Sequence, residues 1–209
     1  NEINIKYSYI LQESATQYGV DQYYVILSHL STYFNNSIIV DVGTHQGHSA
    51  AALAYNKTNE VYTYDIVYMN QAFQRFQNDK YENVEYIIRD CIKDNWQAKI
   101  DKETFLSSEL ICLDVDPHDG IQEQAVVRFL VENDWKGVMV CDDIVGGIDF
   151  REGQPPSESA FQMQKFWNNI ELPKYDITDN KYAHESGTGI VCFDNQEIVD
   201  SFARLNRLK

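Results

Sequence analysis

Short apolar segments alternate with segments of helical periodicity along most of the chain, and this alternation limits the possible folds. The segments that we expect to be strands are SIIVDVG (37–43), EVYTYDI (60–66), NVEYIIRD (83–90), ELICLDV (109–115) and GVMVCDD (137–143). Helical periodicity follows in HSAAALAYN (48–56), QAFQRFQN (71–78) and IQEQAVVRFLVEND (121–134). Strands that alternate with helices form right-handed βαβ units, so we expect a mostly parallel sheet with helices on both faces.

The two ends of the chain complete this prediction. Residues 7–35 have the pattern of one or two amphipathic helices, and a helix through SAFQMQKFWNNI (159–170) follows the fifth strand. Two further strands, KYDIT (174–178) and TGIVCF (188–193), have no room for a helix between them, which favours an antiparallel hairpin at one sheet edge. A terminal helix is expected after them. The predicted fold is therefore α/β, Rossmann-like and doubly wound, with seven strands.

The chain length fits one domain. We expect residues 1–209 to form a single unit, with a helical cap over residues 1–35 and a ligand-binding core over residues 36–209. The chain starts with Asn1 rather than Met, which fits a domain excised from a larger protein.

Charge and cysteine usage restrict the partners. The formal net charge is −15, from 32 acidic and 17 basic residues, which argues against nucleic acid or an anionic membrane as the main partner. No apolar run reaches the roughly 20 residues that a membrane-spanning helix needs.

The four cysteines form no CxxC pair, and three lie in strand-like segments, where reduced thiols act as small apolar groups. We therefore expect a reducing, cytoplasmic setting.

An acidic residue stands at or near the end of each of the first five predicted strands. These residues are Asp41, Asp65, Asp90, Asp114 and the pair Asp142 and Asp143. A single aspartate at such a place often only caps the next helix. In open α/β sheets, however, ligands bind at the carboxyl ends of the strands, so five acids in register predict a rim that binds hydroxyls, amines or a metal.

The loop DVGTHQGHS after the first strand carries the best cofactor signal. Gly43 and Gly47 allow a tight turn and a close approach of the backbone to a ligand. The loop lacks both GxGxxG and GxxxxGK[ST], so a pyrophosphate site is not indicated. A carboxylate at Asp65 could accept from both hydroxyls of a ribose, and Asp90 from an adenine amino group. A ligand with adenosine, no phosphate and a positive centre suits such a rim, and S-adenosylmethionine (SAM) has these properties.

These segments resemble class I SAM-dependent methyltransferases. DVGTHQGHS looks like their first motif, YTYDI like their second, and IIRDC like the adenine-side segment. LDVDPHDG, VMVCDDI and HESGTGIVCF resemble the later strands of metal-dependent small-molecule O-methyltransferases, above all enzymes that act on sugar hydroxyls, with catechol O-methyltransferases more distant. The resemblance covers about residues 35–195.

The resemblance implies roles for individual residues. The methionine end of SAM would be shaped by Asp41, Gly43 and Gly47, with contacts from Thr44, His48 and Ser49. Asp65 would hold the ribose, and Asp90 with Cys91 the adenine. Asp114, Asp142 and Asp143 match the metal-binding acids, for Mg²⁺ or alternatively Mn²⁺ or Ca²⁺. Asp116 matches the base of some sugar methyltransferases.

The base itself stays open between Asp116 and His118, and His118 could instead only orient Asp116. No lysine lies between Asp114 and Gly120, so the lysine base of the catechol enzymes is not expected. A metal bound to the acceptor would lower the pKa of its hydroxyl, and two neighbouring hydroxyls could chelate it. The leading hypothesis is a SAM-dependent, metal-assisted O-methyltransferase acting on a sugar, such as a deoxyhexose in a glycan, or on a similar vicinal diol.

Two alternatives remain. DVD (114–116) matches the DxD pattern of metal-dependent glycosyltransferases that use nucleotide sugars, although that fold needs no glycine loop after its first strand. A binding module without catalytic activity inside a larger glycan-building protein is the third hypothesis. The expected partner is a small-molecule or glycan acceptor, and the sequence does not predict the oligomeric state.

Overall fold

A seven-stranded sheet forms the centre of the protein. The computed structural model describes residues 22–92, 99–144, 158–177 and 187–194. The strands are β1 (Ile38–Val42), β2 (Glu60–Asp65), β3 (Val84–Ile88), β4 (Ser108–Leu113), β5 (Val138–Asp142), β6 (Lys174–Asp176) and β7 (Thr188–Cys192). Their order across the sheet is β3-β2-β1-β4-β5-β7-β6. β7 pairs antiparallel with both β5 and β6, and all other pairs are parallel.

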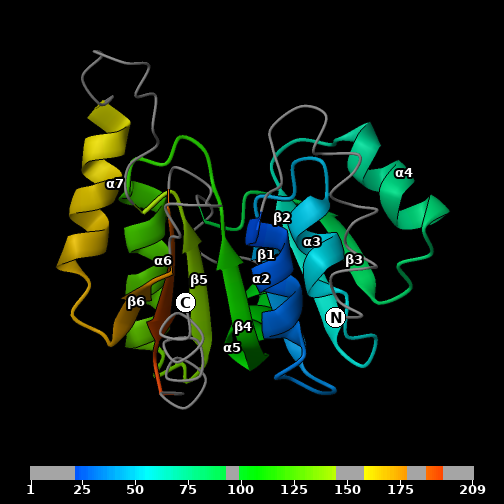
Figure 1. Cartoon of the computed structure of the whole chain (residues 1–209), viewed down its shortest axis with the longest axis horizontal. Helices are drawn as coiled ribbons and strands as arrows, with labels where there is room; N and C mark the ends of the chain where they lie inside the picture. Colours follow the sequence, from blue (N-terminus) through cyan, green and yellow to red (C-terminus); the bar gives the residue numbers. More distant parts are fainter. Residues whose placement is uncertain (1–21, 93–98, 145–157, 178–186, 195–209) are drawn as a thin grey trace.

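Helices cover both faces of this sheet (Figure 1). α2 (Gln22–Ser31), α3 (His48–Leu53) and α4 (Asn70–Asn78) pack on one face, where Leu27, Leu53 and Phe76 belong to one buried cluster. α5 (Lys99–Ser107), α6 (Ile121–Glu132) and α7 (Glu158–Asn169) pack on the other face. There Phe105 and Met163 belong to a second buried cluster. The predicted doubly wound fold with its antiparallel C-terminal edge is confirmed.

Some details differ from the prediction or lie outside the described residues. α5 was not predicted, because residues 99–107 carry no clear apolar stripe between the third and fourth strands. Asp41 lies inside β1 rather than at its end, and Asp90 follows β3 by two residues. Of the predicted N-terminal helices, the described part is α2. The expected terminal helix falls in residues 195–209, outside the described ranges.

The parallel register brings the predicted acids to one edge of the sheet. β1 lies between β2 and β4, with Val42 opposite both Tyr64 and Leu113, and Leu113 in turn lies opposite Cys141. β4 and β5 are almost entirely buried, as expected for central parallel strands. Asp114 and Asp142 therefore follow or end neighbouring strands at the same level of the sheet.

Gly43 is required where β1 passes into its loop. Its φ of +102° lies in the region that side chains rarely adopt. A Cβ at this position would stand 1.6 Å from the backbone oxygen of Asp114. The amide of Gly43 donates to the carbonyl of Tyr64 at 2.9 Å. The loop after β1 is thus pressed between the ends of β2 and β4, and only glycine fits there.

Two further features of the structure concern the cysteines and the helices. All four cysteines are buried, and none forms a disulfide bond. Within the described ranges, none of the helices has both the length and the apolar character that a membrane crossing requires.

Candidate functional site

A cavity of about 440 Å³ opens at the carboxyl ends of β1 to β4. Its volume lies in the usual range of small-molecule sites. The predicted site residues that line it are Gly43, Asp65, Asp90, Cys91, Asp114, Asp116 and His118. The others are absent from its lining: Asp41, Thr44, Gly47, His48, Ser49, Asp142 and Asp143. The cavity therefore joins the predicted ribose and adenine residues to the loop after β4.

Asp65 connects the two loops that flank the cavity. Its Oδ2 accepts from the amide of His45 at 2.7 Å, and its Oδ1 accepts from the amide of Val67 at 2.9 Å. One carboxylate thus fixes the loop after β1 and the loop after β2. Each carboxylate oxygen can accept more than one hydrogen bond, so this side chain can also accept from ligand hydroxyls.

Asp41 lies beneath the glycine loop (residues 43–49) and is fully buried. Its Oδ2 accepts from the hydroxyls of Thr63, at 2.6 Å, and Ser49, at 3.1 Å. Thr44 joins the same group through a 2.6 Å contact between its hydroxyl and that of Thr63. Burial raises the pKa of Asp41 to about 7, although hydrogen bonds from Thr63, Ser49 and Cys112 partly offset it. These residues support the loop from below.

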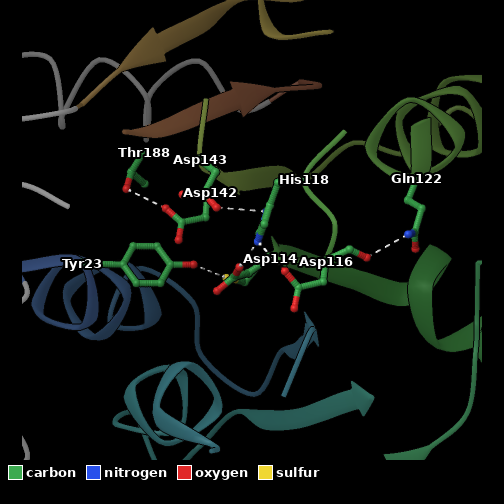
Figure 2. A network of polar contacts seen from close by, with 9 residues as sticks. Tyr23, Asp114, Asp116, His118, Gln122, Asp142, Asp143 and Thr188 are labelled. Atoms are coloured by element: carbon green, nitrogen blue, oxygen red, sulfur yellow. Dashed lines mark hydrogen bonds and ion pairs between the residues drawn. The ribbon is translucent and has the colours of Figure 1, made fainter. Parts of the chain in front are cut away.

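The loop after β4 gathers acids around His118 (Figure 2). The imidazole Nδ1 lies 3.1 Å from Oδ2 of Asp143, without the geometry of a hydrogen bond. Nε2 lies 3.4 Å from Oδ1 of Asp116 and 3.8 Å from Oδ1 of Asp114. The side chain of His118 is 23% exposed, whereas that of Asp116 is 98% exposed. Of the two predicted bases, His118 is thus the one enclosed at the cavity wall.

Asp114 and Asp142 lie near one another, because β4 and β5 are neighbouring strands. Desolvation, and next the charge of Asp142, raise the pKa of Asp114 well above its usual value. Asp142 is buried and accepts from the hydroxyl of Thr188 at 3.3 Å. The hydroxyl of Tyr23, from α2, points toward this pair and contacts the thiol of Cys112 at 3.1 Å (Figure 2). α2 therefore reaches the strand ends at which these two acids lie.

Sequence reasoning missed several cavity residues. They are Val42, His45, Tyr64, Ile66, Val67, Met69, Arg89, Ile92, Val115 and Gln122. Ile66 and Val67 are 68% and 55% exposed, although they are apolar. In the sequence, two apolar residues directly follow the acid at the end of the second strand, and this pattern could have identified Ile66 and Val67. Arg89 forms an ion pair with the buried Asp101, and its position next to Asp90 gave no such signal.

Glu123 is a buried acid that the predicted chemistry does not use. It lies in the first turn of α6, is 1% exposed, and neither carboxylate oxygen has a hydrogen bond within the described residues. The amides of Glu123 and Gly120 lie near enough to stabilise its charge in part. Desolvation nevertheless raises its pKa to about 7.

Comparison with known proteins finds similarity in structure alone. No protein-family model matches the sequence, and no curated protein matches it. A candidate caffeoyl-CoA O-methyltransferase from Staphylococcus aureus superposes with a TM-score of 0.63 at 13% identity, over 88% of this chain and 90% of that chain. The O-methyltransferase from Bacillus cereus, in complex with SAH (S-adenosylhomocysteine), gives 0.58 at 15% identity, over 80% and 79%.

A third solved structure is TomG from Streptomyces achromogenes, an O-methyltransferase of tomaymycin synthesis in complex with SAM. It gives a TM-score of 0.53 at 14% identity, over 81% of this chain and 78% of that chain. At identities of 13–15%, this structural similarity establishes that the chain has the same Rossmann-like fold as these three proteins.

The raised pKa of Glu123 predicts that this residue makes the stability of the protein depend on pH. The pKa of Glu123 is about 7 in the folded protein, above the ordinary 4.5. The folded state therefore favours the protonated acid. Its contribution to the free energy of unfolding is complete below pH 4.5 and is lost as pH rises through 7. Glu123→Gln, which resembles the protonated acid, should raise the free energy of unfolding at pH 8 by on the order of 2 kcal/mol and leave it little changed at pH 4.5.

Urea unfolding at both pH values measures this difference. Glu132→Gln, an exposed change on the same helix, is the control. An equal effect of Glu123→Gln at the two pH values would contradict the assignment.

Proposed function

We propose that the protein is a SAM-dependent O-methyltransferase whose acceptor is a hydroxyl of a sugar or of a similar vicinal diol. The observation that carries this proposal is the cavity at the carboxyl ends of β1 to β4, which combines Gly43, Asp65 and Asp90 with Asp114 and His118. The structural likeness to SAM- and SAH-bound O-methyltransferases supports it.

The donor end of the cavity suits an adenosine with a positive centre. Asp65 can accept from ribose hydroxyls, and Asp90 and Cys91, which the resemblance assigns to the adenine, line the same cavity. Ile66 and Val67 offer apolar surface for a purine ring, whose burial is favourable. The acidic lining also balances the positive charge of a sulfonium.

The acceptor end lies at His118. When SAM is bound, it supplies an electrophilic methyl group, and the acceptor oxygen bonds to this carbon as the S–C bond breaks. His118 Nε2 can take the proton of the attacking hydroxyl, because His118 lines the cavity and its side chain is only partly exposed. Asp143 beside Nδ1 and the two acids beside Nε2 balance the positive charge that the imidazole then carries.

Metal assistance is a finer part of the proposal. Asp114 and Asp142 are hard oxygen donors. Burial, and next the charge of Asp142, raise the pKa of Asp114, so a divalent cation between the two carboxylates would relieve their repulsion. Among the described residues no group of three or more His, Cys, Asp or Glu side chains is arranged to hold a metal. Mg²⁺ is often bound through one or two carboxylates, with water and substrate completing its shell, and two acids fit that mode.

Asp114 and Asp142, with Asp143 as a further candidate, would hold the ion, which would lower the pKa of a bound hydroxyl.

The negative charge of this region also restricts which acceptors can bind. Asp114 and Asp116 line the cavity at the acceptor end, and Asp143 lies beside His118. An acceptor that carries phosphate would be repelled there, so a neutral or cationic polyol fits better.

Asp65 provides a test of the donor site. Wild-type protein should bind SAH in calorimetry, and Asp65→Asn should weaken this binding at least about tenfold, because a charged acceptor for the ribose becomes a neutral amide. Glu132→Gln, on the exposed side of α6, should bind like wild type. Binding of a nucleotide sugar in place of SAH would instead favour a glycosyltransferase.

His118 provides a test of the chemical step. His118→Asn should lower kcat with a vicinal-diol acceptor by about 100-fold or more, the usual effect of removing a general base, with SAH affinity unchanged. Asp116→Asn should have a smaller effect, because its side chain is exposed. A larger loss in Asp116→Asn than in His118→Asn would contradict the assignment of the base.

The metal is tested separately in the wild-type protein. Turnover should fall in chelator by about tenfold or more and should return on addition of Mg²⁺. Asp142→Asn should lose this response to Mg²⁺ while still binding SAH. Full activity in chelator would contradict metal assistance and would leave the donor site unaffected.

A further inference from the structure

We infer that Arg75 on α4 is a positioning residue that holds the glycine loop (residues 43–49) in its cofactor-binding shape. The inference deepens the proposed function and rests on it. Arg75 lies outside the cavity lining, and neither the sequence motifs nor the resemblance assigns it a role.

One guanidinium bridges two points of the loop. Its NH2 group lies 2.6 Å from Nε2 of His48, and its Nε donates to the carbonyl of Gln46 at 3.2 Å. The planar fork of arginine can make both contacts at once, whereas a lysine ammonium on a flexible stem lacks this fixed geometry. Arg75 is therefore suited to hold the segment between Gly43 and α3.

His48 is a neutral partner in this contact. Burial, and next the charge of Arg75, lower the pKa of His48 to about 4, so the ring is uncharged at neutral pH. With Nε2 accepting from Arg75, the ring proton is on Nδ1. The imidazole packs against the ring of Tyr24 of α2 in an edge-to-face arrangement, with centroids 5.5 Å apart. His48 is thus held between α4 and α2 and does not line the cavity.

The loop packs directly on α4 beside this contact. A Cβ on Gly47 would lie 2.8 Å from the ring of Phe76 and 3.3 Å from Cα of Ala72. On its other side the loop is tied to Asp65 through the amide of His45. Contacts with Tyr64, Asp65 and Asp41 hold residues 43–45 and Ser49. Arg75 holds Gln46 and His48, which lie between these points.

The geometry also separates the two halves of the cavity. Arg75 contacts the loop after β1, whereas Asp116 and His118 belong to the loop after β4 and Gln122 to the first turn of α6. Loss of the Arg75 contacts should therefore affect the cofactor rather than the acceptor. A general loss of folding would affect both.

The test compares Arg75→Met with Arg128→Met, the same change at an exposed arginine of α6. Arg75→Met should raise the SAH dissociation constant about tenfold, the scale expected when a positioning contact is lost, with the acceptor KM unchanged. Arg75→Lys should recover part of the affinity. His48→Phe, which keeps the ring packing and removes Nε2, should have a similar effect, and the double variant should be no weaker than either single one.

A second readout needs no ligand. Hydrogen exchange of residues 43–49 should be faster in Arg75→Met than in wild type and Arg128→Met, at equal Tm. Unchanged exchange, or unchanged SAH affinity in Arg75→Met when wild type binds SAH, would overturn the inference. Failure of wild type to bind SAH would overturn the proposed function, and exchange would still decide whether Arg75 orders the loop.

Discussion

The crowding of carboxylates at one edge of a parallel sheet is the constraint on which the rest of the site depends. β1, β2, β4 and β5 end at nearly one level, so the acids near their ends share a small volume. Like charges and lost solvation both disfavour this arrangement. Three of these acids have different surroundings: Asp41 accepts from two hydroxyls, Asp65 accepts from two amides, and Asp143 lies beside the imidazole of His118.

These different environments divide the acids by task. Asp41 is sealed in the core and supports the glycine loop, while Asp65 links the loops on both sides of the cavity. Asp114 faces the cavity, with its pKa raised by burial and by Asp142. Three aspartates thus have different surroundings, and the proposed function uses them differently, as a loop support, a ligand acceptor and a metal ligand.

The fold and the function rest on different grounds. The superpositions establish the Rossmann-like architecture, at identities of 13–15%. The methyltransferase proposal needs in addition the cavity, its acidic lining and the position of His118. The same architecture supports many chemistries, so the residues at the sheet edge carry the functional conclusion.

The sequence by itself determined the sheet class, the five leading strands and the acids near their ends, because apolar periodicity and turn chemistry are local properties. It also identified Gly43, Asp65 and Asp114, since their places follow from strand ends. Only the tertiary structure decided that Asp41 and Ser49 face inward and that His118 lies among acids from two loops. It alone brought Arg75 to the glycine loop, because contacts between residues 27 and 29 positions apart depend on how α4 packs.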